Sequence, residues 1–237
     1  MISSSGKLTG FSGGLGVETK QALLELEKAK ADNVVKPLWH YLRSQLPAKK
    51  FYYMRHGQTD YNLKYLTQGA AIDVPLNDTG LAQAKEAVPA AAKLEFDTVY
   101  CSHMQRAEAT AQVIVDGTGQ DIPLYVLPTM YERDYGFLDG KDGRKYKKMH
   151  VWHTFAEGES WLEFVLRLFH SLQLALQSEG TPFIVAHGAV YGALAELLGA
   201  GSASERMENC SICSFTPAKN HTWTLDVVHG KTYKREG

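Results

Sequence analysis

Short apolar runs alternate along the chain with segments whose apolar residues recur every three or four positions. The runs at 51–54, 97–101 and 182–186 have the length of buried β-strands. Helices are predicted around 81–91, 107–114, 162–176 and 190–198, the first capped by Asn77 and the second by Ser102. Two late stretches, 209–216 and 222–228, predict a hairpin at the sheet edge. Strands that alternate with helices predict an α/β sandwich.

The first 48 residues differ from the rest. Residues 1–17 are rich in serine and glycine and predict a flexible segment. Residues 18–48 predict a helical extension with helices at 18–31 and 37–45, and Pro37 suits a first helical turn. The extension is expected to pack against the domain at 49–237 or against a neighbouring subunit, which leaves a homo-oligomer open.

Composition narrows the class of protein. With 237 residues, 44% of them hydrophobic, the chain can bury one substantial core. A net charge of −1 argues against nucleic acid or a membrane as a partner. No apolar run resembles a membrane span or a signal peptide, so a cytoplasmic protein is expected.

Cysteine and histidine give no sign of a metal or a disulfide. Cys210 and Cys213 have CxxC spacing, but they lie in a predicted strand, where their thiols should point to opposite faces. His150 and His153 are the nearest approach to a ligand pair, without a carboxylate at useful spacing. We therefore expect no metal and no other cofactor.

The strongest chemical signal is Arg55-His56-Gly57-Gln58-Thr59, directly after the first apolar run. It places a nucleophilic imidazole beside a fixed positive charge, on a turn where Gly57 would let an anion approach the backbone. The pentapeptide alone is a moderate signal, because a histidine after a strand is more often structural. It needs partners elsewhere in the chain.

Three later residues supply them. Arg106 is predicted in the first turn of a helix beyond a strand end, where helix N-termini favour anions. His187 ends the run 182–186 and is followed by Gly188, a second strand–His–Gly turn at the same sheet edge. Glu132 lies in a loop-like stretch and could act as a general acid. Each alone has an ordinary surface or structural explanation.

Taken together, these motifs resemble the histidine phosphatase superfamily, which includes cofactor-dependent phosphoglycerate mutases and many small-molecule phosphatases. The resemblance runs from about residue 50 to about residue 228. It rests on the following motifs: Arg55-His56-Gly57-Gln58-Thr59 with Asn62, Gln68-Gly69, Pro75-Leu76-Asn77 with Gly80, Ser102 with Arg106-Ala107 and Thr110-Ala111, Glu132 with Gly136 and Gly140, Gly158-Glu159-Ser160, and Ala186-His187-Gly188. It implies a three-layer α/β/α sandwich with a mostly parallel central sheet and an antiparallel edge strand.

The resemblance also implies roles. His56 would take the phosphoryl group as phosphohistidine, while Arg55, Arg106 and His187 hold its oxygens. Glu132 would protonate the leaving alcohol and then activate water. The residues expected to line the substrate site are Thr59, Asn62, Gln68, Gly69 and Gly188. Two guanidiniums match the equatorial oxygens of a transferring phosphoryl group, and their charge should keep His56 neutral.

The acceptor of the phosphoryl group separates three hypotheses. The stretch 141–157 is shorter than the mutase insertion, and Gln58-Thr59 and Gln68-Gly69 resemble the phosphatase branch, so we expect a phosphomonoesterase acting on a small phosphate ester. A phosphoglycerate mutase is the alternative. An inactive scaffold is a third, kept open by the N-terminal extension. The basic stretch 141–148 is expected to be a solvated loop or to attract a second anionic group of the substrate.

Overall fold

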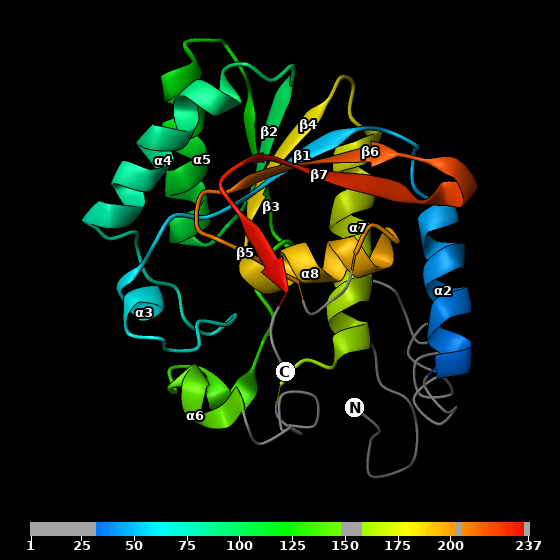
Figure 1. The fold of residues 1–237 in the computed structure, drawn as a ribbon, viewed down its shortest axis with the longest axis horizontal. Helices are drawn as coiled ribbons and strands as arrows, with labels where there is room; N and C mark the ends of the chain where they lie inside the picture. The colour runs from blue at the N-terminus through cyan, green and yellow to red at the C-terminus, as the bar shows by residue number, and fades with distance from the viewer. Residues whose placement is uncertain (1–31, 148–157, 202–204, 235–237) are drawn as a thin grey trace. The chain divides into compact units, whose positions relative to one another are not determined.

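The computed structural model describes residues 32–147, 158–201 and 205–234. Its strands are β1 (Phe51–Arg55), β2 (Thr98–Ser102), β3 (Leu124–Leu127), β4 (Pro182–Ala186), β5 (Glu205–Met207), β6 (Ile212–Pro217), β7 (Trp223–His229) and β8 (Thr232–Lys234). Its helices are α2 (Asp32–Ser44), α3 (Asp60–Leu63), α4 (Asp78–Ala91), α5 (Gln105–Thr118), α6 (Gly143–Lys147), α7 (Trp161–Gln177) and α8 (Gly188–Leu197), with short 3-10 turns at Gly136–Leu138 and Lys219–His221. They are traced in Figure 1.

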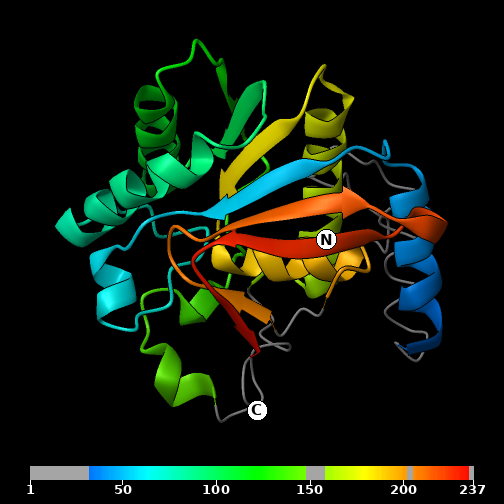
Figure 2. The ribbon, with the colours of Figure 1, turned by 45° about the horizontal axis from the view of Figure 1, so that its top comes forward.

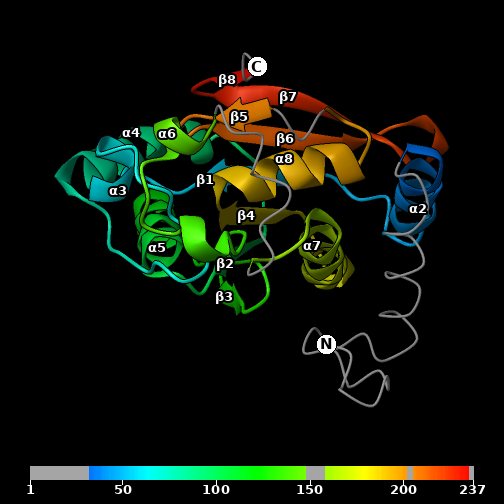
Figure 3. The same ribbon diagram turned by 90° about the horizontal axis from the view of Figure 1, so that it is seen from below.

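The central sheet has six strands in the order β3-β2-β4-β1-β6-β7. Strands β3, β2, β4 and β1 are parallel, and β6 runs antiparallel to β1. Strand β7 pairs with β6 as the predicted hairpin and forms one edge, visible in red in Figure 2. A separate two-stranded sheet joins β5 to β8, as Figure 3 shows. The predicted α/β fold with a mostly parallel sheet is confirmed.

Alternating side chains of β1 separate the helical layers. Tyr52 and Met54 belong to the core cluster that includes the buried alanines of α4 and α5. The ring of Tyr53 points to the other face and lies 6.1 Å from the ring of Tyr191 in α8. Helices α4 and α5 therefore cover one face and α8, packed with α7, covers the other.

Several local predictions were wrong. Ser102 does not cap the helix that follows, because the N-cap of α5 is Met104, two residues later. Cys210 precedes β6 in a left-handed turn (φ 57°). Even so, it packs with the Tyr52 side of the sheet, while Cys213 pairs with Tyr53, so the two thiols do lie on opposite faces.

The residues before Leu46 form a unit of their own. In it, α2 begins at Asp32, so Pro37 lies in the second helical turn and not the first. There a proline cannot donate the bond to the carbonyl four residues earlier. The predicted flexible segment at 1–17 and the helix at 18–31 lie outside the described residues.

Candidate active site

Three parallel strands end at one edge of the sheet and bring the predicted residues together. His56 follows β1 and His187 follows β4, its direct neighbour. The backbone N–H of His56 donates to Ala186 at 2.9 Å, which extends that pairing by one residue. Arg106 lies in the first turn of α5 after β2, on the other side of β4. The two imidazole rings are 5.3 Å apart, so the predicted common edge is confirmed.

The hydrogen bond of His56 defines its tautomer. Its Nδ1 lies 2.7 Å from the carbonyl oxygen of Gly57. Because a carbonyl only accepts, Nδ1 carries the proton and Nε2 keeps its lone pair. Burial, followed by the positive charges of Arg106 and Arg55, lowers the pKa of His56 well below its ordinary value. The ring is thus neutral at neutral pH, with Nε2 ready to attack an electrophile.

Both arginines are held by backbone carbonyls. Arg55 donates from Nη1 to Met207 at 2.7 Å, and Arg106 donates from Nη1 to Ile72 at 2.8 Å. Within the described residues, the buried Nε of each has no hydrogen-bond partner. Burial lowers the pKa of Arg106 to about 10, so its guanidinium stays protonated at neutral pH. Two fixed cations with donors to spare flank His56, a suitable arrangement for an oxyanion.

His187 adds a neutral imidazole. Its Nε2 lies 2.8 Å from Oγ of Ser102, and its carbonyl accepts a hydrogen bond from the hydroxyl of Tyr53 at 2.6 Å. Burial, then the charge of Arg106, lowers the pKa of His187 well below its ordinary value. Its Nδ1 is buried and finds no partner among the described residues, which leaves it for a ligand oxygen. The sequence had predicted Ser102 as a helix cap and not as a partner of His187.

Glu132 lies beside this group in a buried position, 7% exposed. One carboxylate oxygen accepts from the backbone N–H of Arg133 at 2.9 Å. The other accepts from the backbone N–H of Ala189 at 3.1 Å, in the first turn of α8. Its charge acts on both Arg55 and Arg106. The structure therefore brings all five predicted catalytic residues together.

The predicted substrate residues form a polar network behind His56. Thr59 caps α3 together with Asn62, and its hydroxyl donates to Gln68 at 2.5 Å. Asn209, which the sequence did not single out, donates from its side chain to the backbone carbonyl of His56 at 2.8 Å and to Asn62 at 3.4 Å. These side chains hold the turn after β1 in place.

The structure shows what surrounds the three glycines that were predicted to lie in the site. The N–H of Gly57 donates to the hydroxyl of Thr110 at 3.0 Å, and a Cβ there would come within 2.5 Å of the carbonyl oxygen of Gly80. Gly57 thus permits a close backbone crossing, a reason for glycine that the predicted approach of an anion did not include. Gly69 donates its N–H to Asp139 at 2.8 Å. At Gly188 a Cβ would lie 3.4 Å from Nε of Arg55, an ordinary contact distance, so the surroundings of this residue do not require glycine.

The basic stretch is described as far as Lys147. Arg144 is exposed, forms an ion pair with Asp142 at 2.7 Å and stacks over the ring of Tyr65. Lys141 lies over the ring of Phe137. A bridge between Leu66 and Asp142 ties this stretch to the loop that carries Gln68 and Gly69.

Neither a metal cluster nor a membrane-spanning helix is found in the part of the chain that the structure describes. No group of three or more histidine, cysteine, aspartate or glutamate side chains is arranged to hold a metal ion there. Likewise, none of the helices in the described part of the chain combines the length and apolarity of a membrane span.

Comparison with known proteins shows which protein family the chain resembles. A family profile described as histidine phosphatase superfamily (branch 1) matches residues 51–229. A 2,3-bisphosphoglycerate-dependent phosphoglycerate mutase of Mesorhizobium japonicum is 36% identical over 170 residues, which cover 64% of this chain and 82% of that protein. An uncharacterized phosphatase, PhoE, of Bacillus subtilis is 32% identical over 149 residues, 62% of this chain and 76% of the relative.

Two solved structures have a similar fold. A mycobacterial glucosyl-3-phosphoglycerate phosphatase superposes with a TM-score of 0.63 at 25% identity, covering 76% of this chain and 97% of its own. A structure named mycobacterial hydrolase 1 gives a TM-score of 0.66 at 27% identity, covering 76% of this chain and 98% of its own.

Proposed function

The chain belongs to the histidine phosphatase superfamily, and we propose that it is a metal-independent phosphomonoesterase acting on a small phosphate ester through a phosphohistidine on His56. The observation that carries the proposal is the bond between Nδ1 of His56 and the Gly57 carbonyl. It leaves the Nε2 lone pair of a neutral imidazole beside Arg55 and the fully buried Arg106, the arrangement that nucleophilic attack on a phosphate ester requires.

In the first step, Nε2 of His56 attacks phosphorus and the bond from phosphorus to the ester oxygen breaks. Donors of Arg55 and Arg106, with Nδ1 of His187, stabilise the charge on the three equatorial oxygens. Glu132, protonated at this stage, transfers its proton to the departing alkoxide, and the alcohol leaves.

In the second step, water attacks the phosphohistidine in line with the nitrogen–phosphorus bond. Glu132, now a carboxylate, takes a proton from that water, and the electron pair of the breaking bond returns to Nε2. Inorganic phosphate leaves, and both residues are restored to their starting protonation states. The same two residues thus serve both halves of the cycle.

Phosphoglycerate mutase activity is the second candidate, favoured by the 36% identical mutase. Against it stand the short 141–157 stretch and the Gln58-Thr59 pair, which resemble the phosphatase branch. The relatives named phosphatases support the same preference.

Product analysis decides between these two activities. With 3-phosphoglycerate and a catalytic amount of 2,3-bisphosphoglycerate, we expect either free phosphate or no reaction, because water is the proposed acceptor. Phosphorus NMR of the mixture distinguishes the products. Rapid formation of 2-phosphoglycerate without phosphate release would replace the phosphatase proposal with the mutase.

Chelation tests the metal-free mechanism. Hydrolysis of para-nitrophenyl phosphate should continue in excess EDTA, because Arg55, Arg106 and His187 supply the charge that a metal ion supplies in other phosphatases. Vanadate, which mimics the five-coordinate transition state, should inhibit. Loss of activity in EDTA with recovery on adding a divalent cation would contradict the mechanism. Absence of turnover under all conditions would favour the scaffold hypothesis.

A further inference from the structure

We infer that Arg167 and Glu159 are positioning residues that fix the segment carrying Glu132 for proton transfer, an inference that rests on the proposed acid–base role of Glu132. Neither touches the reacting atoms. Arg167 comes from the middle of α7 and Glu159 from just before its N-terminus. We call the two side chains the α7 clamp.

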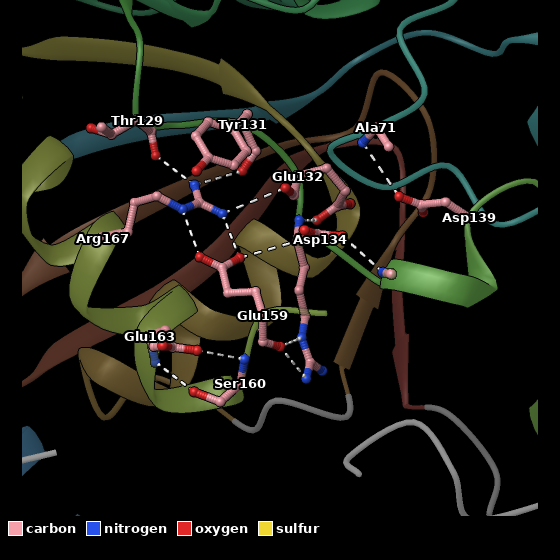
Figure 4. A network of polar contacts seen from close by, with 12 residues as sticks. Ala71, Thr129, Tyr131, Glu132, Asp134, Asp139, Glu159, Ser160, Glu163 and Arg167 are labelled. Carbon is pink, nitrogen blue, oxygen red and sulfur yellow. Dashed lines mark hydrogen bonds and ion pairs between the residues drawn. The ribbon is translucent and has the colours of Figure 1, made fainter. Parts of the chain in front are cut away.

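Arg167 binds the backbone on the N-terminal side of Glu132. It is 8% exposed, and its Nη1 donates to the carbonyls of Thr129 at 2.6 Å and Tyr131 at 3.0 Å. A longer contact of 3.5 Å reaches the carbonyl of Glu132 itself. The guanidinium also stacks on the ring of Tyr131, 3.5 Å from its centroid. Figure 4 shows these contacts converging on one side chain.

Glu159 binds the other side of the segment. Its carboxylate accepts from Nε and Nη2 of Arg167, both at 2.8 Å, in a two-pronged ion pair. Its backbone N–H donates to the carbonyl of Asp134 at 2.9 Å. Its carbonyl accepts two bonds from the guanidinium of Arg133, at 2.9 and 3.0 Å. Residues 129–134 are therefore held on both sides of Glu132.

Together with Ala189, the α7 clamp holds Glu132 at two places, its backbone and its carboxylate. The backbone of the Glu132 segment is fixed from α7, while one carboxylate oxygen is fixed by Ala189 of α8. Helices α7 and α8 pack together, so the two supports come from the same helical layer. A shift of the segment by about 1 Å would misplace the carboxyl group, and misplacement on that scale costs about a hundredfold in rate.

A charged pair suits this task better than apolar packing. The carbonyls of Thr129, Tyr131 and Glu132 all point at one place, and only a fork of N–H donors satisfies them together. Glu159 then neutralises the buried cation. The arrangement specifies one position for the Glu132 backbone.

The test compares two substrates in conservative variants. In Glu159→Gln and Arg167→Lys, kcat/KM for β-glycerol phosphate should fall about 10- to 100-fold, because the poor leaving group needs its proton. For para-nitrophenyl phosphate, whose leaving group needs little protonation, the loss should stay below about threefold. In a Glu132→Gln background, Glu159→Gln should no longer change the ratio of the two rates.

Glu163→Ala is the matched control. Glu163 closes the capping box with Ser160 at the start of the same helix, so its loss destabilises α7 without touching residues 129–134. It should lower thermal stability and leave the ratio of the two rates unchanged. An equal fall for both substrates in the clamp variants, or a ratio change that persists in the Glu132→Gln background, would overturn the inference.

Amide hydrogen exchange gives a readout that does not depend on activity. Amides of residues 129–134 should exchange about tenfold faster in Glu159→Gln than in Glu163→Ala. Unchanged protection would refute the clamp even in an active enzyme. If the wild type forms no phosphohistidine on His56, the proposed function fails, and the exchange measurement still decides whether the clamp holds the segment.

Discussion

Replacing His56 with alanine is expected to abolish turnover while the chain remains folded. The covalent route has no other nucleophile, so kcat should fall by at least about four orders of magnitude, the scale seen when a catalytic nucleophile is removed. The fold should survive because the side chain's hydrogen bond goes to the adjacent Gly57, not to a distant element. Steady-state rates with para-nitrophenyl phosphate and a thermal melt measure both outcomes.

Phosphoenzyme trapping makes this result specific. A substrate labelled in its phosphoryl group should leave an acid-labile, alkali-stable label on the wild type and on a His229→Ala control, since His229 lies on the edge strand β7. The His56→Ala protein should carry none. A label that survives in His56→Ala would show that another residue is the nucleophile.

The strand–turn–helix frame of the site was predictable because it rests on local patterns. The apolar runs before His56, His187 and Arg106 are strands, and the residues that follow them mark the strand ends. Because these strands are parallel, their carboxyl ends lie at the same edge of the sheet. The types of catalytic side chain, a nucleophile, cations and an acid, could be predicted from the chemistry of phosphoryl transfer. Both signals are contained in a few consecutive residues, so a single sequence carries them.

What the sequence did not predict depends on contacts between distant segments. Nothing near Gly57 signals that the backbone of Gly80 crosses beside it. The support of Asn209 for the His56 carbonyl joins residues 153 positions apart. Strand β3 was not predicted either, although its residues Leu124 to Leu127 are all apolar, and the exposure of Tyr125 and Val126 in its middle appears only in the fold.

Arg167 is a case in which a signal was present. It lies on the helical face shared by Phe164 and Leu168, both fully buried, where a lone arginine needs several partners. The pattern indicates a buried charge but not its acceptors, because carbonyl directions in residues 129–132 are a property of the folded backbone. The sequence therefore predicts a helix over 162–176 but no task for Arg167.

Replacing Glu132 with glutamine is expected to separate the two halves of the cycle. Glutamine keeps the size of the side chain but can neither give nor take the proton. For an alkyl phosphate, kcat/KM should fall about 10²- to 10⁴-fold, the range of general acid catalysis, because the alkoxide must leave unprotonated. For para-nitrophenyl phosphate, kcat/KM reports only the steps up to the phosphoenzyme and should change much less.

The same variant should accumulate phosphohistidine, because the second half of the cycle depends on Glu132 as the base whatever the leaving group was. With para-nitrophenyl phosphate, rapid mixing should show a burst of nitrophenol close to one per active site, followed by slow turnover. The structure sets one condition on this result. Both carboxylate oxygens accept a backbone N–H, from Arg133 and Ala189, and the amide nitrogen of glutamine must face one of these donors. A melt alongside the kinetics is needed to show that the variant stays folded. Equal losses of kcat/KM for both substrates, without a burst, would mean that Glu132 transfers no proton and supports the site only as a buried acceptor.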